Sequence, residues 1–109
     1  MKKIINEFGT IFYYNENDKY HREDGPAIEW ASGDKEWYKD GKYHREDGPA
    51  IEYVNGTKCW FKNGKHHRED GPAVEYTNGY KEYWYNGILY SEIKTDEEWI
   101  RFVKLMVFQ

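Results

Sequence analysis

Short segments rich in aromatic and β-branched residues alternate with glycine-containing dipeptides along most of the chain. Such segments favour β-strands, and Asn-Gly, Asp-Gly and Ser-Gly favour the left-handed conformations of two-residue hairpin turns. The dipeptides lie at residues 32–33, 40–41, 55–56, 63–64, 78–79 and 86–87. The pattern therefore predicts antiparallel β-hairpins whose strands, such as AIEWA and KEWYK, are about five residues long.

A repeat of 23 residues organises these hairpins. The heptapeptide HREDGPA begins at His21, His44 and His67, and it has decayed to Tyr90-Ser91 in a fourth half-unit. End units of a stacked array face water, so they are expected to differ from the middle ones. We therefore predict a mainly β fold: about three and a half hairpin units over residues 8–91, forming a single twisted antiparallel sheet. Each unit supplies one hairpin to this sheet, and the stretch KYHREDGP is a connector that doubles back.

The last segment changes to a helical period. TDEEWIRFVKLMVF begins with a capping box formed by Thr95 and Glu98. Its apolar residues recur along one broad face; they are Trp99, Phe102, Val103, Met106 and Val107. We predict an α-helix over residues 95–108 that covers the open end of the sheet.

The composition fits a thin sheet with aromatic faces. The chain has 109 residues, which indicates one domain over residues 1–109. It contains five Trp, eleven Tyr and five Phe but few aliphatic residues. Aromatic side chains bury a large area each, so they can replace a thick aliphatic core.

Charge, hydropathy and cysteine content exclude several classes. The single cysteine, Cys59, cannot form an internal disulfide. No apolar run is long enough for a transmembrane helix, and the first residues lack the apolar region of a signal peptide. The net charge of −4 gives no support for direct nucleic-acid binding or for binding to anionic membranes. We expect a cytoplasmic protein.

The repeated charged residues are candidate site residues with two interpretations. They could be metal ligands or acid–base groups, or they could form a structural ladder in which each arginine pairs with acidic residues of the same or the next unit. One active site needs only one copy, so three copies favour the structural ladder; no enzyme activity, metal site or cofactor is predicted. The ladder consists of His21, Arg22, Asp24, His44, Arg45, Asp47, His67, Arg68 and Asp70.

A single-layer sheet has two faces, and one helix cannot cover both, so some aromatic residues are expected to stay exposed. Exposed Trp and Tyr beside charges are typical of protein-binding hot spots. The candidate binding residues are Trp30, Lys35, Trp37, Tyr43, Tyr53, Trp60, His66, Tyr76, Tyr83 and Trp84. A second possibility is that a regular row of carboxylates imitates a phosphate backbone; its members are Glu23, Glu29, Glu46, Glu52, Glu69 and Glu75.

The unit W-Y-x-N/D-G-K-x-H-R-E-D-G-P-A-x-E-x-x-x-G resembles a MORN-type repeat, in the variant form found in bacterial, phage and large-virus proteins. The resemblance covers Gly9 to Tyr90 and leaves out the C-terminal segment. The chain departs from the eukaryotic form in its glycine spacing and in its HREDGPA core, so the resemblance does not by itself imply the lipid-binding role of that form. The resemblance implies a small phage-encoded protein that inhibits a host defence system, as anti-CRISPR proteins do, in the host cytoplasm.

Two functional hypotheses follow. The first is a non-enzymatic protein-binding module that docks on a nucleic-acid-handling defence enzyme, such as a CRISPR nuclease, and blocks it. The alternative is a structural or assembly module that forms a homodimer through its sheet edge or its helix. A membrane-associated MORN-type scaffold is a third possibility, and it is the one that the net charge of −4 disfavours.

Overall fold

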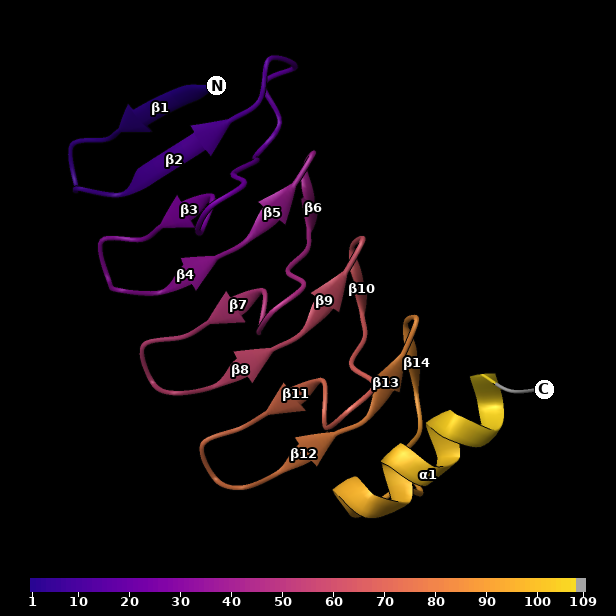
Figure 1. Cartoon of the computed structure of the whole chain (residues 1–109). Helices are drawn as coiled ribbons and strands as arrows, with labels where there is room; N and C mark the ends of the chain where they lie inside the picture. Colours follow the sequence, from indigo (N-terminus) through magenta and orange to yellow (C-terminus); the bar gives the residue numbers. More distant parts are fainter. Residues whose placement is uncertain (108–109) are drawn as a thin grey trace.

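Four hairpins lie side by side and form an eight-stranded antiparallel sheet (Figure 1). The computed structural model describes residues 1–107. The strands of this main sheet are, in spatial order, β1 (Lys2–Ile5), β2 (Ile11–Tyr14), β3 (Ile28–Glu29), β4 (Lys35–Glu36), β7 (Ile51–Glu52), β8 (Lys58–Cys59), β11 (Val74–Glu75) and β12 (Lys81–Glu82). The mainly β repeat fold is therefore confirmed, and β1 extends it upstream of the predicted start at residue 8.

Each unit also carries a second, smaller hairpin outside the main sheet (Figure 1). These hairpins pair β5 (Tyr38–Lys39) with β6 (Lys42–Tyr43), β9 (Phe61–Lys62) with β10 (Lys65–His66), and β13 (Trp84–Tyr85) with β14 (Ile88–Leu89). The prediction of a single sheet is thus incomplete, because three two-stranded sheets accompany the main one. The segment KEWYK is not one strand: the chain leaves the main sheet at Trp37 and enters the small hairpin.

The two kinds of hairpin have different turns. In the small hairpin both Asp40 (φ 49°) and Gly41 (φ 84°) are left-handed, as a two-residue type I′ turn requires. In the main-sheet hairpin only Gly33 has a positive φ, of 102°, and the Trp30 amide donates to the Asp34 carbonyl across a longer loop. The prediction of two-residue turns is therefore correct for the small hairpins and wrong for the main-sheet hairpins.

The core lies between the main sheet and the small hairpins. Strand register places Ile28, Ile51 and Val74 in one row on one face of the sheet, and each of these side chains is buried. Cys59 lies in the same row, and Tyr43, Phe61 and Trp84 from the small hairpins pack against its cluster. On the opposite face, Ala27, Ala50 and Ala73 are fully buried, so this face also has a tightly packed line.

Helix α1 (Asp96–Val107) closes one end of the stack. The capping box forms as predicted: the Glu98 amide donates to Thr95 Oγ1, and the Thr95 amide donates to Glu98 Oε1. The predicted helix end at residue 108 lies outside the described residues. Trp99 is fully buried, its ring centroid is 5.6 Å from that of Tyr83, and its Nε1 donates to the Arg68 carbonyl at 2.8 Å.

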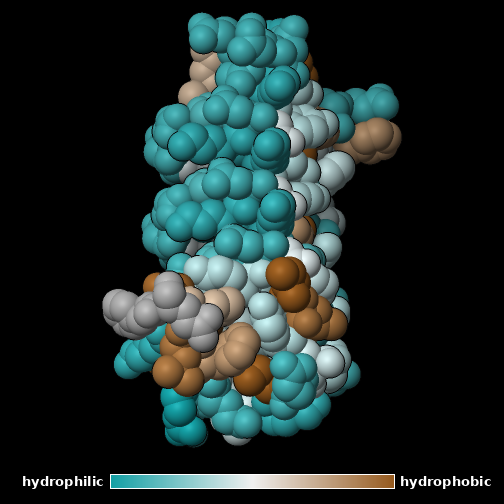
Figure 2. Space-filling model, turned by 90° about the vertical axis from the view of Figure 1, so that its right-hand side faces the viewer, coloured by the Kyte–Doolittle hydropathy of each residue, from teal (hydrophilic) through white to brown (hydrophobic). Residues whose placement is uncertain are grey.

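Figure 2 shows polar residues stacked along most of the molecule and apolar residues gathered near the end that carries α1. In this region Ile88 and Leu89 of β14 and Leu105 and Val107 of α1 are exposed. The helix therefore has a buried side, which contacts the last repeat, and an outer side that keeps apolar atoms in contact with solvent.

We expect Trp99→Ala to lower the free energy of unfolding by about 3–5 kcal/mol, because it leaves a large cavity and an unpaired Arg68 carbonyl. Leu105→Ala, on the exposed side of the same helix, is the matched control and is expected to change stability by less than about 0.5 kcal/mol. Urea unfolding followed by tryptophan fluorescence and circular dichroism measures both. Equal effects of the two substitutions would show that α1 does not act as a cap.

Candidate functional site

The histidines of the HREDGPA loops join one unit to the next. Nδ1 of His44 accepts a hydrogen bond from the Asn63 amide at 3.0 Å, so its proton is on Nε2, which donates to Glu46 at 2.5 Å. The same pair of contacts is made by His21 and by His67, with the amides of Asp40 and Asn86. Each amide belongs to the first residue of the left-handed turn in the following small hairpin, so each histidine holds that turn in place.

The arginines hold the loop against the main sheet. The guanidinium of Arg45 lies 3.8 Å from the ring centroid of Trp37. Its Nη1 donates to the Pro49 carbonyl and to Glu52, and its Nε donates to Asp47. A cation over an indole ring that also pairs with carboxylates is stabilised by both contacts.

The arrangement recurs around Arg22, which lies over Tyr13, and Arg68, which lies over Trp60. A Cβ atom at Gly48 would lie 2.9 Å from Cζ of Arg45, so a side chain at this position would require the guanidinium to move. The residues predicted to form a ladder thus make the same contacts in each unit.

Glutamate and lysine alternate along one face of the main sheet, the face that also carries Ala27, Ala50 and Ala73. Strand register places them in the order Glu29, Lys35, Glu52, Lys58, Glu75 and Lys81. Each glutamate in this row also pairs with the arginine of its own unit. The negative charges are therefore balanced by neighbours of opposite charge, which is unlike the uninterrupted charge of a phosphate backbone.

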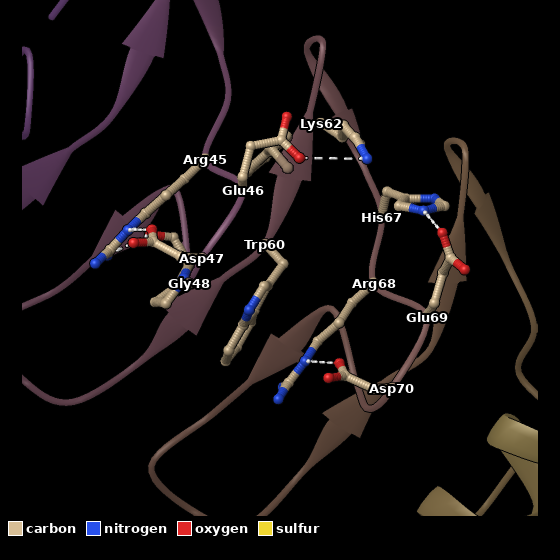
Figure 3. A pocket seen from close by; sticks show the side chains of 12 residues that line it. Arg45, Glu46, Asp47, Gly48, Trp60, Lys62, His67, Arg68, Glu69 and Asp70 are labelled. Carbon is tan, nitrogen blue, oxygen red and sulfur yellow. Dashed lines mark hydrogen bonds and ion pairs between the residues drawn. The ribbon is translucent and has the colours of Figure 1, made fainter. Parts of the chain in front are cut away.

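Two open grooves separate successive HREDGPA loops. Their volumes are about 640 Å³ and 590 Å³, and the residues lining the second repeat those of the first except that Phe61 replaces Tyr38. Trp60 lies on the floor of the second groove, between the loop of Arg45 and the loop of Arg68 (Figure 3). Lys62 lines this groove and pairs with Glu46 at 3.4 Å, a contact that the repeat alone did not indicate.

A column of rings in contact, some stacked and some tilted, begins at Tyr14 and Tyr20 and runs through the small hairpins. Neighbouring ring centroids in it are 4.1 to 5.3 Å apart. The rings are, in order, Tyr14, Tyr20, Tyr38, Tyr43, Phe61, His66 and Trp84. Of the candidate binding residues, Tyr43, His66 and Trp84 lie in this column and are only partly exposed. Their first role is to join the units to one another by stacking.

Glu36 is the polar centre of the second unit, which contains β3 to β6; the third unit contains β7 to β10. It accepts hydrogen bonds from Nε1 of Trp30 at 2.6 Å and from the hydroxyls of Tyr38 and Tyr43 at 2.8 and 3.1 Å. Burial, together with these hydrogen bonds and the nearby carboxylate, raises the pKa of Tyr38 well above its ordinary value. These phenols therefore stay protonated and continue to donate to Glu36.

The third unit replaces this polar centre as a set. Cys59 takes the place of Glu36, Phe61 takes the place of Tyr38, and His66 takes the place of Tyr43. The carboxylate and both of its hydroxyl donors are therefore lost together. Burial raises the pKa of the Cys59 thiol. Nδ1 of His66 is buried and has no hydrogen-bond partner among residues 1–107.

The remaining candidate binding residues differ widely in exposure. Trp30, Tyr53 and Tyr76 occupy equivalent positions in three units and are 39%, 41% and 41% exposed. Trp37 and Trp60 lie beneath the arginines. Lys35 is exposed on the face of the main sheet that carries the row of glutamates and lysines. Tyr83 is only 2% exposed because α1 covers it, so it is not accessible to a partner.

Two exposed residues beside this row were not singled out from the sequence. Val54 and Tyr80, in the loops of the main-sheet hairpins, are 71% and 59% exposed. Tyr80 lies 5.5 Å from Tyr76 between ring centroids. Both positions vary between units, because their equivalents include Ala31 and Asp34, and this variation is the signal that could have identified them.

Comparison with protein-family models, with curated proteins and with solved structures gives no match. Within residues 1–107 no group of three or more His, Cys, Asp or Glu side chains is placed to hold a metal ion. Across the same residues, no helix combines the length and apolar character needed to cross a membrane.

Introducing the second unit's polar centre into the third provides a test of this description. We expect Cys59→Glu alone to lower the free energy of unfolding by about 2 kcal/mol, because the carboxylate lacks its donors. Adding Phe61→Tyr and His66→Tyr should recover most of this loss. Chemical unfolding of the single and triple variants measures these changes in stability. Effects that simply add would show that residues 59, 61 and 66 are not energetically coupled.

His66 predicts an acid-sensitive stability. Burial lowers the pKa of His66 below its ordinary value of 6.5, so the unfolded chain binds this proton more readily than the folded one. The contribution of His66 to the free energy of unfolding is complete above the pKa of the unfolded chain, and it is lost as the pH falls through the pKa of the folded protein. We therefore expect the stability of His66→Phe, measured relative to the unmodified chain by thermal unfolding, to be greater at pH 5 than at pH 7.5. A difference that does not change with pH would contradict the lowered pKa of His66.

Proposed function

We propose that the chain is a non-enzymatic protein-binding module whose contact surface is the row formed by Trp30, Tyr53, Val54, Tyr76 and Tyr80, called here the aromatic margin. The observation that carries the proposal is the exposure of these residues along one side of the core. Exposed large side chains at regular spacing on a soluble repeat array are typical of an interaction surface. Trp and Tyr are also the residues most enriched at binding hot spots.

The aromatic margin is held in place before any partner arrives. Nε1 of Trp30 donates to Glu36, and its ring meets Phe12 edge to face with 5.9 Å between centroids. Tyr76 packs beside Tyr80. Side chains that are already ordered lose less entropy on binding than mobile ones. The surface is therefore suited to docking against a protein without rearrangement.

A non-enzymatic role is supported by the positions of the reactive side chains. The histidines, arginines and acidic residues of the HREDGPA loops make the same internal contacts in each of three units. A catalytic set needs groups that are free to contact a substrate and that differ from their structural copies. The ladder residues instead account for the connection between units.

The finer proposal concerns the class of partner. The resemblance of the HREDGPA unit to the phage variant of the MORN repeat suggests a phage-encoded, anti-CRISPR-like inhibitor that acts in the host cytoplasm on a nucleic-acid-handling enzyme. The alternation of glutamate and lysine on the opposite face disfavours imitation of a phosphate backbone. Direct contact through the aromatic margin, which obstructs nucleic-acid entry or a required motion, is therefore the mechanism that we propose.

The test compares two faces of one protein. The tagged chain is incubated with a lysate of bacteria that carry a CRISPR nuclease, and the bound nuclease is identified by mass spectrometry. We expect Trp30→Ala combined with Tyr53→Ala and Tyr76→Ala to abolish capture and to restore DNA cleavage by the purified nuclease. The matched control replaces Lys35, Lys58 and Lys81 with alanine on the other face and should leave both unchanged. Equal binding by the two variants would overturn the proposed surface, and undiminished cleavage with the unmodified chain would overturn the inhibitor role.

A further inference from the structure

The main sheet begins at β1 and ends at β12, and the outer edge of β1 belongs to the longer of these two terminal strands. β1 pairs with β2 alone among the described strands. The Asn6 amide donates to the Thr10 carbonyl. From that pair onward, hydrogen-bonded pairs of residues alternate with non-hydrogen-bonded pairs along β1 and β2. Lys2 and Ile4 therefore direct their backbone groups toward β2, whereas Lys3 and Ile5 direct theirs away from it.

The neighbouring strand confirms this alternation. Tyr13, which is opposite Lys3, directs its amide away from β1 and donates it to the Ala27 carbonyl on the β3 side at 2.8 Å. By the same geometry the amides and carbonyls of Lys3 and Ile5 point outward from the sheet. An edge of this kind is a template for another strand.

The side chains at this edge offer little protection against pairing. Ile4 and Ile5 are 45% and 59% exposed, and Phe8 in the adjoining turn is 74% exposed. Edge strands that avoid association carry charged side chains, above all lysine, or prolines or bulges. β1 has two lysines, but their ammonium groups lie over the rings of Tyr14 and Tyr13 of β2, and β1 has a regular register without proline or bulge. Ile4 is opposite Phe12, which is opposite Ile28, so the buried row of the core continues to this edge.

We infer that two copies of this chain pair antiparallel through the outer edges of their β1 strands and join two eight-stranded sheets into one. The inference stands apart from the proposed inhibitor function, because it uses a different surface and needs no other protein. The partner that we infer is a second copy of the chain, because the outward backbone groups of two β1 strands can pair with each other in one antiparallel register.

Backbone geometry selects that register. Residues with outward amides must lie opposite each other to exchange two hydrogen bonds per pair. Placing Lys3 opposite Ile5 of the second copy meets this requirement twice and puts Ile4 opposite Ile4 on the two-fold axis. Placing Lys3 opposite Lys3 sets like charges against each other, which is destabilising. Placing Ile5 opposite Ile5 leaves Lys3 facing Glu7, which lies in the turn beyond β1, so only one pair is formed.

The two-fold contact itself explains why association stops at two copies. It uses the outer β1 edge of both copies, so no β1 edge is left for a third copy, and the contact closes as a dimer rather than growing into a filament. The Ile4 side chains would meet across the axis and extend the buried row from one sheet into the next.

A charge-swap pair tests the dimer and its register together. Sedimentation velocity over a wide concentration range should show the unmodified chain at twice the monomer mass. Ile4→Lys and Ile4→Glu should each be monomeric, because like charges meet on the axis, and an equimolar mixture should recover the doubled mass. Circular dichroism checks that each variant keeps its fold.

The control addresses the other apolar surface. Leu105→Lys, on the exposed side of α1, should leave the dimer intact. A monomeric unmodified chain at every concentration, a dimer that survives Ile4→Lys, or a dimer lost with Leu105→Lys would each overturn the inference. None of these results depends on whether the chain captures a nuclease, so the two proposals fail independently.

Discussion

Each HREDGPA loop carries the chain from a small hairpin back to the main sheet, and its arginine fixes this return. The guanidinium of Arg45 lies over the ring of Trp37, the residue at which the chain leaves the main sheet. It also pairs with Glu52, which lies in the strand that the chain enters next. The adjacent His44 reaches forward to the Asn63 amide. One dipeptide therefore closes its own unit and positions the following one, and the stacking of rings and the burial of the core row depend on that placement.

The variation between units shows how polar groups are tolerated in so thin a core. Glu36 is accompanied by three donors, and Glu82 accepts a hydrogen bond from Nε1 of Trp84 at 2.9 Å. Where cysteine replaces the carboxylate, Phe61 also replaces a tyrosine. A half-buried charge is stable only with its partners present, so these positions change together. The repeat is thus uniform in its ladder residues and variable in the residues that fill the core and the aromatic margin.

The two ends of the array show what the sequence could reveal. The helix, its capping box and its apolar face follow from local chemistry, and the turn type of the small hairpins follows from Asp40-Gly41 and its copies. The role of Trp99 could not be read in the same way, because its contacts with Tyr83 and the Arg68 carbonyl join residues far apart in the chain. The free edge of β1 likewise became visible only when the order of the strands was known.

By itself the sequence determined the period, the hairpins, the ladder of charged residues and the terminal helix, because each depends on residues close together in one unit. The tertiary structure decided that the chain leaves the main sheet at Trp37 to form a second hairpin, since strand alternation looks the same whether one sheet or two is formed. It also decided which aromatic residues are available. Tyr83 and Tyr53 each follow a glutamate in a short strand segment, yet α1 buries the first, and the second is 41% exposed.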